Sequence, residues 1–284
     1  MITEEKTRIL IPLDGSEAGE AVLPALYPLI RAHRVESTLF HAAETPEEAA
    51  TAQVYLEKRR KILESQGVAT RILIGSGSPV EEILSQAETG GYDVIAMATH
   101  GRTGLDRVLM GSVAEEVVRR SRLPVLLSRN GAPMGNWGRI LVALDGTPGS
   151  EEILTSVATL ARNLRATVYL VKVGLSLLTA DGYRGVTLSQ EAEETGPYLE
   201  EIAMQLISQG IPTLTEEREG MAGVEIPRMA RQIEAGLICM MTEGRPETVP
   251  GLDRSIAAAV IRTAPCPVYV RRMAGAPGIK KTVR

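Results

Sequence analysis

The chain has few aromatic residues. They make up 3% of its 284 residues, with one Trp and one Phe. Flavin sites and platforms for single-stranded nucleic acid commonly stack their ligands on aromatic rings, so this scarcity argues against both. The 44% of hydrophobic residues must therefore fill the core mainly with Val, Ile, Leu, Ala and Met.

Basic charge, cysteine and long apolar runs are also scarce. The net charge of −4 predicts no nucleic-acid partner. The two cysteines, Cys239 and Cys266, lie in apolar runs, so we expect buried thiols in a reducing compartment rather than a disulfide or a metal site. No stretch has the length and apolar character of a membrane span or a signal peptide. These features predict a cytoplasmic protein with no membrane partner.

The chain contains an internal repeat. Residues 7–16 (TRILIPLDGS) return as 138–147 (GRILVALDGT), and residues 123–129 (LPVLLSR) return as 266–272 (CPVYVRR). The offset grows from 131 (138 − 7) to 143 (266 − 123), so the second copy holds extra residues, which we place in 174–196. The repeat predicts the following division of the chain: an N-terminal domain over 1–130, a linker over 131–137, a C-terminal domain over 138–273 and a flexible tail over 274–284.

Each copy alternates short apolar runs, typical of buried strands, with longer amphipathic runs, typical of helices. We predict strands near 8–13, 36–43, 69–74, 93–98 and 124–129, and again near 139–144, 166–173, 212–217, 236–241 and 267–272. Helices are predicted near 17–33, 46–66, 78–89 and 111–121. This order predicts an α/β protein of two doubly wound domains, each with a five-stranded parallel sheet that binds ligands outside the carboxyl ends of its strands.

Two segments are expected to meet at that edge of the first sheet. The stretch from Met97 to Val113 (MATHGRTGLDRVLMGSV) joins a strand to a helix that opens on Gly111-Ser112. Glycines such as Gly101 let the backbone approach a ligand, and the N–H groups of a helix start attract anions. Asp14 ends the first strand and suits the base or sugar of a nucleotide. The same Asp-Gly-Ser sequence also forms an ordinary turn, so both interpretations stay open.

These residues resemble the universal stress protein family, as a tandem member with two family domains. The family motif is Gly, two residues, Gly, nine residues, then Gly-Ser or Gly-Thr; the later positions match here, and Ala98 replaces the first glycine. The resemblance implies a Rossmann-like fold of the adenine nucleotide α-hydrolase type and a site for ATP or another adenine nucleotide, with or without Mg²⁺. The positions it implies for nucleotide binding are Pro12, Asp14, Ala42, Met97, Ala98, Gly101, Gly111, Ser112 and Val113.

The two copies differ at this motif. A side chain at Ala98 costs about 1–2 kcal/mol if the backbone there needs positive φ, and little if it lies in strand register, which we expect. In the second copy Met241 stands at the Ala98 position, Gly244 persists, and Arg254-Ser255 replace Gly111-Ser112. We therefore expect the first copy to bind nucleotide and the second to be structural.

The sequence shows neither a catalytic constellation nor metal-ligand spacing among its three histidines. For His41 two interpretations stay open: it lines the adenine pocket, or it packs in the core. His100 is expected to face solvent. The resemblance implies a stress-response regulatory or interaction protein with an unidentified protein partner. A nucleotide-independent interaction module and a very slow ATPase are the alternatives. The resemblance also implies that residues 125–128 and 268–271 face each other in an intramolecular pseudo-dimer, with a further homodimer left open.

Overall fold

The computed structural model describes residues 6–32, 35–100, 110–129, 137–174, 195–243 and 255–273. The strands are β1 Thr7–Pro12, β2 Val35–Ala43, β3 Ala69–Ser76, β4 Val94–Ala98, β5 Val125–Ser128, β6 Arg139–Leu144, β7 Thr167–Gly174, β8 Thr213–Glu219, β9 Leu237–Thr242 and β10 Val268–Arg272. The helices are η1 Gly19–Ala21, α1 Val22–Ala25, α2 Tyr27–Arg31, α3 Pro46–Ser65, α4 Pro79–Thr89, α5 Ser112–Arg120, α6 Pro148–Glu151, α7 Leu154–Leu164, α8 Thr195–Ser208, α9 Ala222–Gln232 and α10 Ile256–Thr263.

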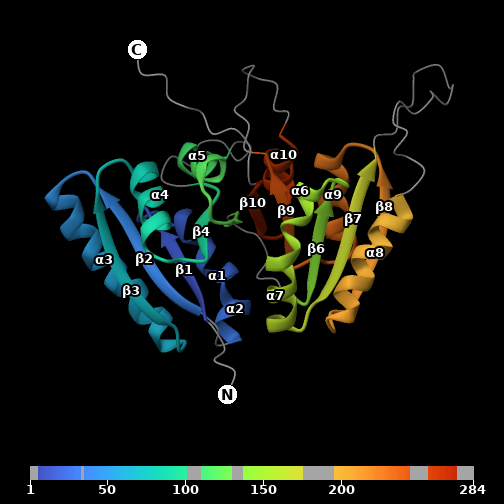
Figure 1. The fold of residues 1–284 in the computed structure, drawn as a ribbon. Coiled ribbons are helices and arrows are strands. Elements are labelled where there is room, and N and C mark those ends of the chain that lie inside the picture. Colours follow the sequence, from blue (N-terminus) through green and yellow to red (C-terminus); the bar gives the residue numbers. More distant parts are fainter. Residues whose placement is uncertain are drawn as a thin grey trace, which may run out of the picture.

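The strands form one sheet in the order β3-β2-β1-β4-β5-β10-β9-β6-β7-β8. The N-terminal half (β1–β5 with η1 and α1–α5) and the C-terminal half (β6–β10 with α6–α10) lie side by side in it, coloured blue to green and green to red (Figure 1). Within each half all the strand pairs are parallel, which confirms the predicted doubly wound fold. Strand order reverses between β1 and β4, so the ligand crevice of this fold is expected at their carboxyl ends.

The halves join through their last strands, as the family resemblance implied. β10 pairs antiparallel with β5, placing Tyr269 opposite Leu126 and Val268 opposite Leu127. With the repeat offset of 143, Tyr269 is the equivalent of Leu126 itself. The pairing is therefore centred on one pair of equivalent residues, which is the geometry of a two-fold interface. The chain is an intramolecular pseudo-dimer.

Two arginines make the same contact in opposite directions across this interface. Arg129, after β5, donates from Nη1 to the carbonyl oxygen of Arg262 at 2.9 Å. Arg272, at the end of β10, donates from Nη1 to the carbonyl oxygen of Arg119 at 3.3 Å. Each acceptor lies in the last turn of a helix, where carbonyl groups lack partners within the helix. Each half thus supplies a cation to the carboxyl end of a helix in the other.

Replacing either Arg129 or Arg272 is expected to weaken the interface between the two halves. Arg129→Ala and Arg272→Ala should each lower the free energy of unfolding by about 1.5 kcal/mol, the lower end of the net value of a hydrogen bond that involves a charged group. Urea denaturation followed by circular dichroism measures this. Arg122→Ala is the matched control, since that side chain is 84% exposed and lies 4.0 Å from the carboxylate of Glu88. Equal effects of all three substitutions would contradict the interface role.

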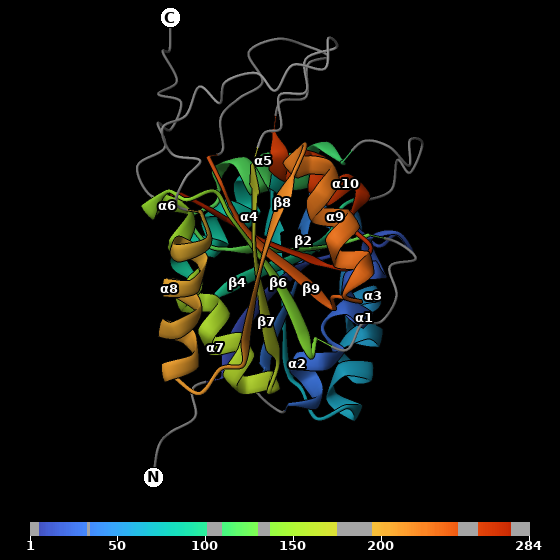
Figure 2. The ribbon, with the colours of Figure 1, turned by 90° about the vertical axis from the view of Figure 1, so that its right-hand side faces the viewer.

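The core forms two clusters that run through both halves. One contains buried residues of α1, α2, α3, α7 and α8, and the other contains buried residues of α4, α5, α9 and α10. In the turned view, α7 and α8 lie on one side of β6–β9, and α9 and α10 lie on the other (Figure 2). Both clusters contain residues from each half, so the two halves share their hydrophobic core.

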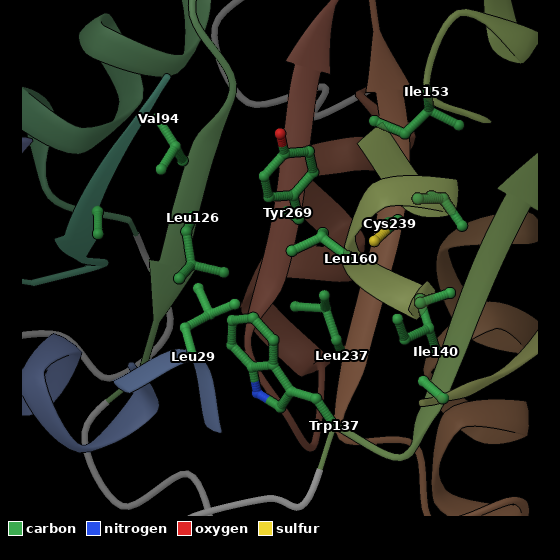
Figure 3. Packing of buried hydrophobic residues seen from close by; sticks show 14 of the residues in the cluster. Leu29, Val94, Leu126, Trp137, Ile140, Ile153, Leu160, Leu237, Cys239 and Tyr269 are labelled. Carbon is green, nitrogen blue, oxygen red and sulfur yellow. The ribbon is translucent and has the colours of Figure 1, made fainter. Parts of the chain in front are cut away.

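Trp137 lies where the halves meet. Its side chain is 1% exposed and belongs to the first cluster. Figure 3 shows the indole ring near Leu29 and Leu126 of the N-terminal half and near Leu237 of the C-terminal half. The residue lies just before β6, at the end of the stretch that the sequence predicted as a linker. The single tryptophan therefore contributes packing area to the interface.

One predicted helix is wrong. The sequence pattern indicated a continuous helix over 17–33, but the structure divides this region into η1, α1 and α2, with residues 33–34 outside the described part. Pro24 and Pro28 explain the breaks, because proline has no N–H to donate to the carbonyl four residues earlier and its ring crowds that carbonyl. The four-residue α1 and five-residue α2 are short as a result.

The cysteines are buried, as predicted. Cys239 and Cys266 are 0% and 5% exposed and form no disulfide. Burial raises the pKa of the Cys266 thiol to about 12 and also raises that of Cys239, so both thiols stay protonated at neutral pH. Among the described helices none is long and apolar enough to cross a membrane.

Candidate functional site

The end of β1 is shaped by a tight turn around Asp14. Oδ1 of Asp14 accepts hydrogen bonds from the N–H of Ser16 at 3.0 Å and from its hydroxyl at 2.7 Å. Oγ of Ser16 accepts from the N–H of Gly19 at 2.9 Å. Gly15 has a φ of +83°, which glycine adopts without steric cost. The Asp-Gly-Ser sequence therefore forms the ordinary turn, and this turn fixes the direction of the Asp14 carboxylate.

Gly19 makes room for that carboxylate. A Cβ atom on Gly19 would lie 2.4 Å from Oδ1 of Asp14, closer than side-chain carbons approach. Pro12, the last residue of β1, is half-buried. Leu13 extends the pairing of β1 with β2 by donating its N–H to the carbonyl of Phe40 at 2.8 Å. Asp14 therefore follows directly after the last backbone hydrogen bond between these strands. The acidic side chain is thus held at the carboxyl edge of β1.

Ala42 lies at the same edge, next to the end of β2. It is half-buried and pairs with Gly75 of β3. Its predecessor His41 is buried, and the Nδ1 atom of that ring lies 2.7 Å from the carbonyl oxygen of Leu13. Of the two interpretations of this histidine, packing in the core is the one that the structure shows. The ring joins the ends of β1 and β2 from within the core.

Met97 and Ala98 end β4 and are 6% and 8% exposed. Ala98 pairs with Ser128 of β5, so it stays in strand register as expected. Positive φ values among the described residues other than glycine occur at Arg165 and Glu234 alone. The backbone at Ala98 therefore carries no left-handed strain, and its methyl group imposes no conformational cost there.

Thr99, after β4, and Gly111, before α5, lie side by side. Thr99 extends β4 by donating its N–H to the carbonyl of Ser128 at 2.9 Å, and its own carbonyl accepts the N–H of Gly111 at 2.7 Å. Gly111 is thereby held at the carboxyl end of β4. Gly101, which the sequence also assigned to the site, lies outside the described residues.

Helix α5 begins at this point. Gly111 is its N-cap residue in an extended conformation, and no side chain accepts a hydrogen bond from the first turn of the described helix. Ser112 is exposed and Val113 is half-buried. The first N–H groups of a helix have no partner within the helix and carry a partial positive charge. This start therefore offers backbone donors to an anion at the carboxyl edge of the sheet.

The C-terminal half repeats the first turn. Oδ1 of Asp145 accepts from the N–H of Thr147 at 2.8 Å and from its hydroxyl at 2.6 Å. Burial alone would raise the pKa of the Asp145 carboxyl, but these hydrogen bonds together lower it. The acidic turn is therefore common to both halves and does not distinguish them.

The second helix start differs from the first. Helix α10 begins at Ile256, and its N-cap Ser255 accepts the N–H of Ala258 on its own hydroxyl at 3.2 Å. Ser255 is the repeat equivalent of Ser112. Counted from the N-cap, the third N–H of α10 is therefore bonded to a side chain, whereas N-cap Gly111 of α5 offers no side chain to the corresponding N–H. Met241 at the end of β9 is 6% exposed, while Gly244 and Arg254 lie outside the described part of the chain.

Histidine and acidic residues elsewhere do not form a metal site in the described ranges: no cluster of three His, Cys, Asp or Glu side chains is present there. His100 differs from the expectation that it faces solvent. It is half-buried, its Nδ1 lies 2.9 Å from the hydroxyl of Thr99, and its Nε2 is shielded from solvent.

Two similar doubly wound halves, related by a two-fold arrangement and joined through their last strands, define a tandem α/β protein, and each half bears an acidic turn after its first strand. The model of the universal stress protein family matches residues 6–129 and 136–272. The chain belongs to this family, with two family domains.

Individual relatives agree. The universal stress protein E homolog of Haemophilus influenzae is 28% identical over 211 residues, covering 68% of this chain and 66% of that protein. A universal stress protein of Methanocaldococcus jannaschii is 43% identical over 72 residues, but the match spans 25% of this chain and 44% of that relative. The crystal structure of a universal stress protein from Archaeoglobus fulgidus has a TM-score of 0.77 at 21% identity, covering 96% of this chain and 99% of that one.

Proposed function

We propose that the N-terminal half binds an adenine nucleotide at the carboxyl ends of β1, β2 and β4, and that the C-terminal half supports this site without binding. The base and ribose lie near Asp14 and Ala42, and the phosphates lie at Gly111, Ser112 and Val113. Membership of the universal stress protein family supports a nucleotide of the adenine class, with or without Mg²⁺. Bound nucleotide then acts as a regulatory ligand that changes how the chain meets a protein partner.

The observation that carries the proposal is the start of α5. It presents backbone donors that no side chain of the described helix caps, and the Thr99–Gly111 hydrogen bond holds it beside the switch point. Phosphate groups bind well at such helix starts because the donors and the helix dipole both favour negative charge. The relaxed strand conformation of Ala98 supports the proposal, since it leaves the β4 end free of backbone strain.

Titration with a fluorescent ATP analogue tests this directly. We expect saturable binding that ATP, ADP and AMP displace, and that GTP displaces less well because the contacts near Ala42 select adenine. Denaturing the purified protein and separating the released small molecules provides an independent check. Absence of saturable binding together with absence of adenine in the extract would favour the nucleotide-independent interaction module instead.

A further inference from the structure

The starts of α9 and α10 carry exposed apolar side chains. Met221, the N-cap residue of α9, is 70% exposed, Val224 in its first turn is 57% exposed, and Ile256, the first residue of α10, is 50% exposed. We call these three residues the α9–α10 patch. Apolar side chains that are grouped on a surface and bordered by polar residues mark sites of protein contact, whereas single ones do not.

The packing of the two helices brings the patch residues together. A Cβ atom on Gly223 would lie 2.8 Å from the Cβ atom of Ala259, so α9 and α10 touch just after their starts. Near their ends, Nη2 of Arg231 donates to the carbonyl of Thr263 at 2.7 Å, so the helices run side by side in the same direction (Figure 2). Each patch residue lies within one helical turn of the contact between Gly223 and Ala259. The patch is therefore continuous across both helices.

The N-terminal half has an ionic surface at the equivalent place. The starts of α4 and α9 differ by the repeat offset of 143 (222 − 79), so Val224 corresponds to Glu81. The Glu81 carboxylate accepts hydrogen bonds at 2.6 and 2.8 Å from both Nη atoms of Arg120 in α5. The residue of α10 that corresponds to Arg120 is Thr263. The fold itself therefore does not require apolar residues at this surface, and the C-terminal half has them in place of an ion pair.

The charges that border the patch fit a second copy of the same chain. Glu219 precedes the patch and Arg228 follows Val224 by one turn of α9, and both side chains are exposed. A two-fold axis places one surface of a chain against the same surface of its copy. If two α9 helices pack antiparallel about Val224, Arg228 of each lies opposite Gly220 of the other, because both are four positions from the centre. Arg228 then lies beside Glu219 of the second copy, so the border is complementary to itself.

We propose that the α9–α10 patch is the contact surface of a homodimer, in which two copies of this chain pack their α9 helices antiparallel about a two-fold axis near Val224. The patch residues form the apolar centre of the contact, and Arg228 and Glu219 form ion pairs across its border. The strands β5 and β10 are already paired within the chain, so this dimer uses a different surface. Three apolar side chains are few beside the roughly 800 Å² that each partner buries in a stable complex, so the dimer forms reversibly.

Sedimentation equilibrium of the full chain tests this, because it measures average mass against protein concentration. The chain has a mass of 30.5 kDa, and the average mass is expected to rise toward twice this value between about 10 and 100 µM. Val224→Glu introduces the residue of the N-terminal half and places two like charges near the axis, so it should raise the dissociation constant at least about tenfold. Met204→Glu is the matched control, because Met204 of α8 is apolar and 63% exposed but lies outside the patch. This control should stay within about twofold of the wild-type constant.

A charge exchange tests the two-fold geometry. Arg228→Glu and Glu219→Arg should each weaken the dimer by placing like charges opposite each other, and the double variant should recover the wild-type dissociation constant. Thermal unfolding checks that each variant is folded, since Arg228→Glu also removes the 3.1 Å ion pair with Glu225.

Three results would overturn the inference. The first is a wild-type protein that stays monomeric over the whole range, which would leave a different protein as the partner of the patch. The second is equal weakening by Val224→Glu and Met204→Glu. The third is a double charge variant that associates no better than the single ones. None of these results bears on nucleotide binding, which the proposed function places in the other half.

Discussion

Ser112→Asp is expected to weaken ATP binding at least about tenfold without harming the fold. Two charges about 4 Å apart interact by about 4 kcal/mol at an effective dielectric constant of 20, and salt reduces this at an exposed position such as Ser112. A loss of about 1.4 kcal/mol already corresponds to tenfold. An aspartate in the first turn also stabilises a helix by about 0.3–1 kcal/mol, so the unfolding temperature should stay level or rise.

Ser255→Asp is the matched control for this prediction. Aspartate serves as an N-cap as well as serine does, so the cap on Ala258 should be kept. The substitution adds the same charge at the equivalent position of the C-terminal half, and we expect ATP affinity to stay within about twofold of the wild-type value. Equal losses in both variants would indicate that charge alone, rather than the start of α5, controls binding.

Trp137→Ala is expected to destabilise the whole chain by about 3 kcal/mol or more, because it opens a cavity in the core that the two halves share. Both halves should lose stability together, since Trp137 belongs to a core cluster with buried residues of each half and its ring lies near Leu126 and Leu237 (Figure 3). Chemical denaturation followed by circular dichroism measures the effect.

Trp137→Phe separates packing from hydrogen bonding. The indole Nε1 is buried and has no hydrogen-bond partner in the described ranges, so removing it leaves no acceptor unpaired. We expect this variant to cost less than half as much as Trp137→Ala. The surface substitution Val54→Ala, at a position 59% exposed, should change little. If Trp137→Ala costs no more than Val54→Ala, the shared core does not hold the halves together.

Much of the fold follows from the sequence. Buried parallel strands are short continuous apolar runs, and each of the ten predicted strands lies within about two residues of an observed one. The β5–β10 pairing was expected from the family resemblance and the repeat. The helix predicted over 17–33 is divided into three short helices, because Pro24 and Pro28 lack the N–H groups that would continue it, and apolar spacing does not reveal such breaks.

The site was only partly predictable. The sequence named Asp14, Ala98 and Ser112, but it left open whether Asp14 belongs to an ordinary turn, and the structure shows that turn. The contrast between the starts of α5 and α10 depends on where each helix begins, a shift of one residue that spacing does not reveal. The contact of His41 with Leu13 joins the ends of β1 and β2, and such long-range contacts leave no local pattern.

The asymmetry between the halves is the central claim, and calorimetric stoichiometry tests it most directly. Titration of the full chain with ATP should give one equivalent per chain, and Ser112→Asp should remove or strongly weaken that single event while Ser255→Asp leaves it in place. Two equivalents per chain, or one equivalent that Ser255→Asp abolishes and Ser112→Asp does not, would contradict it.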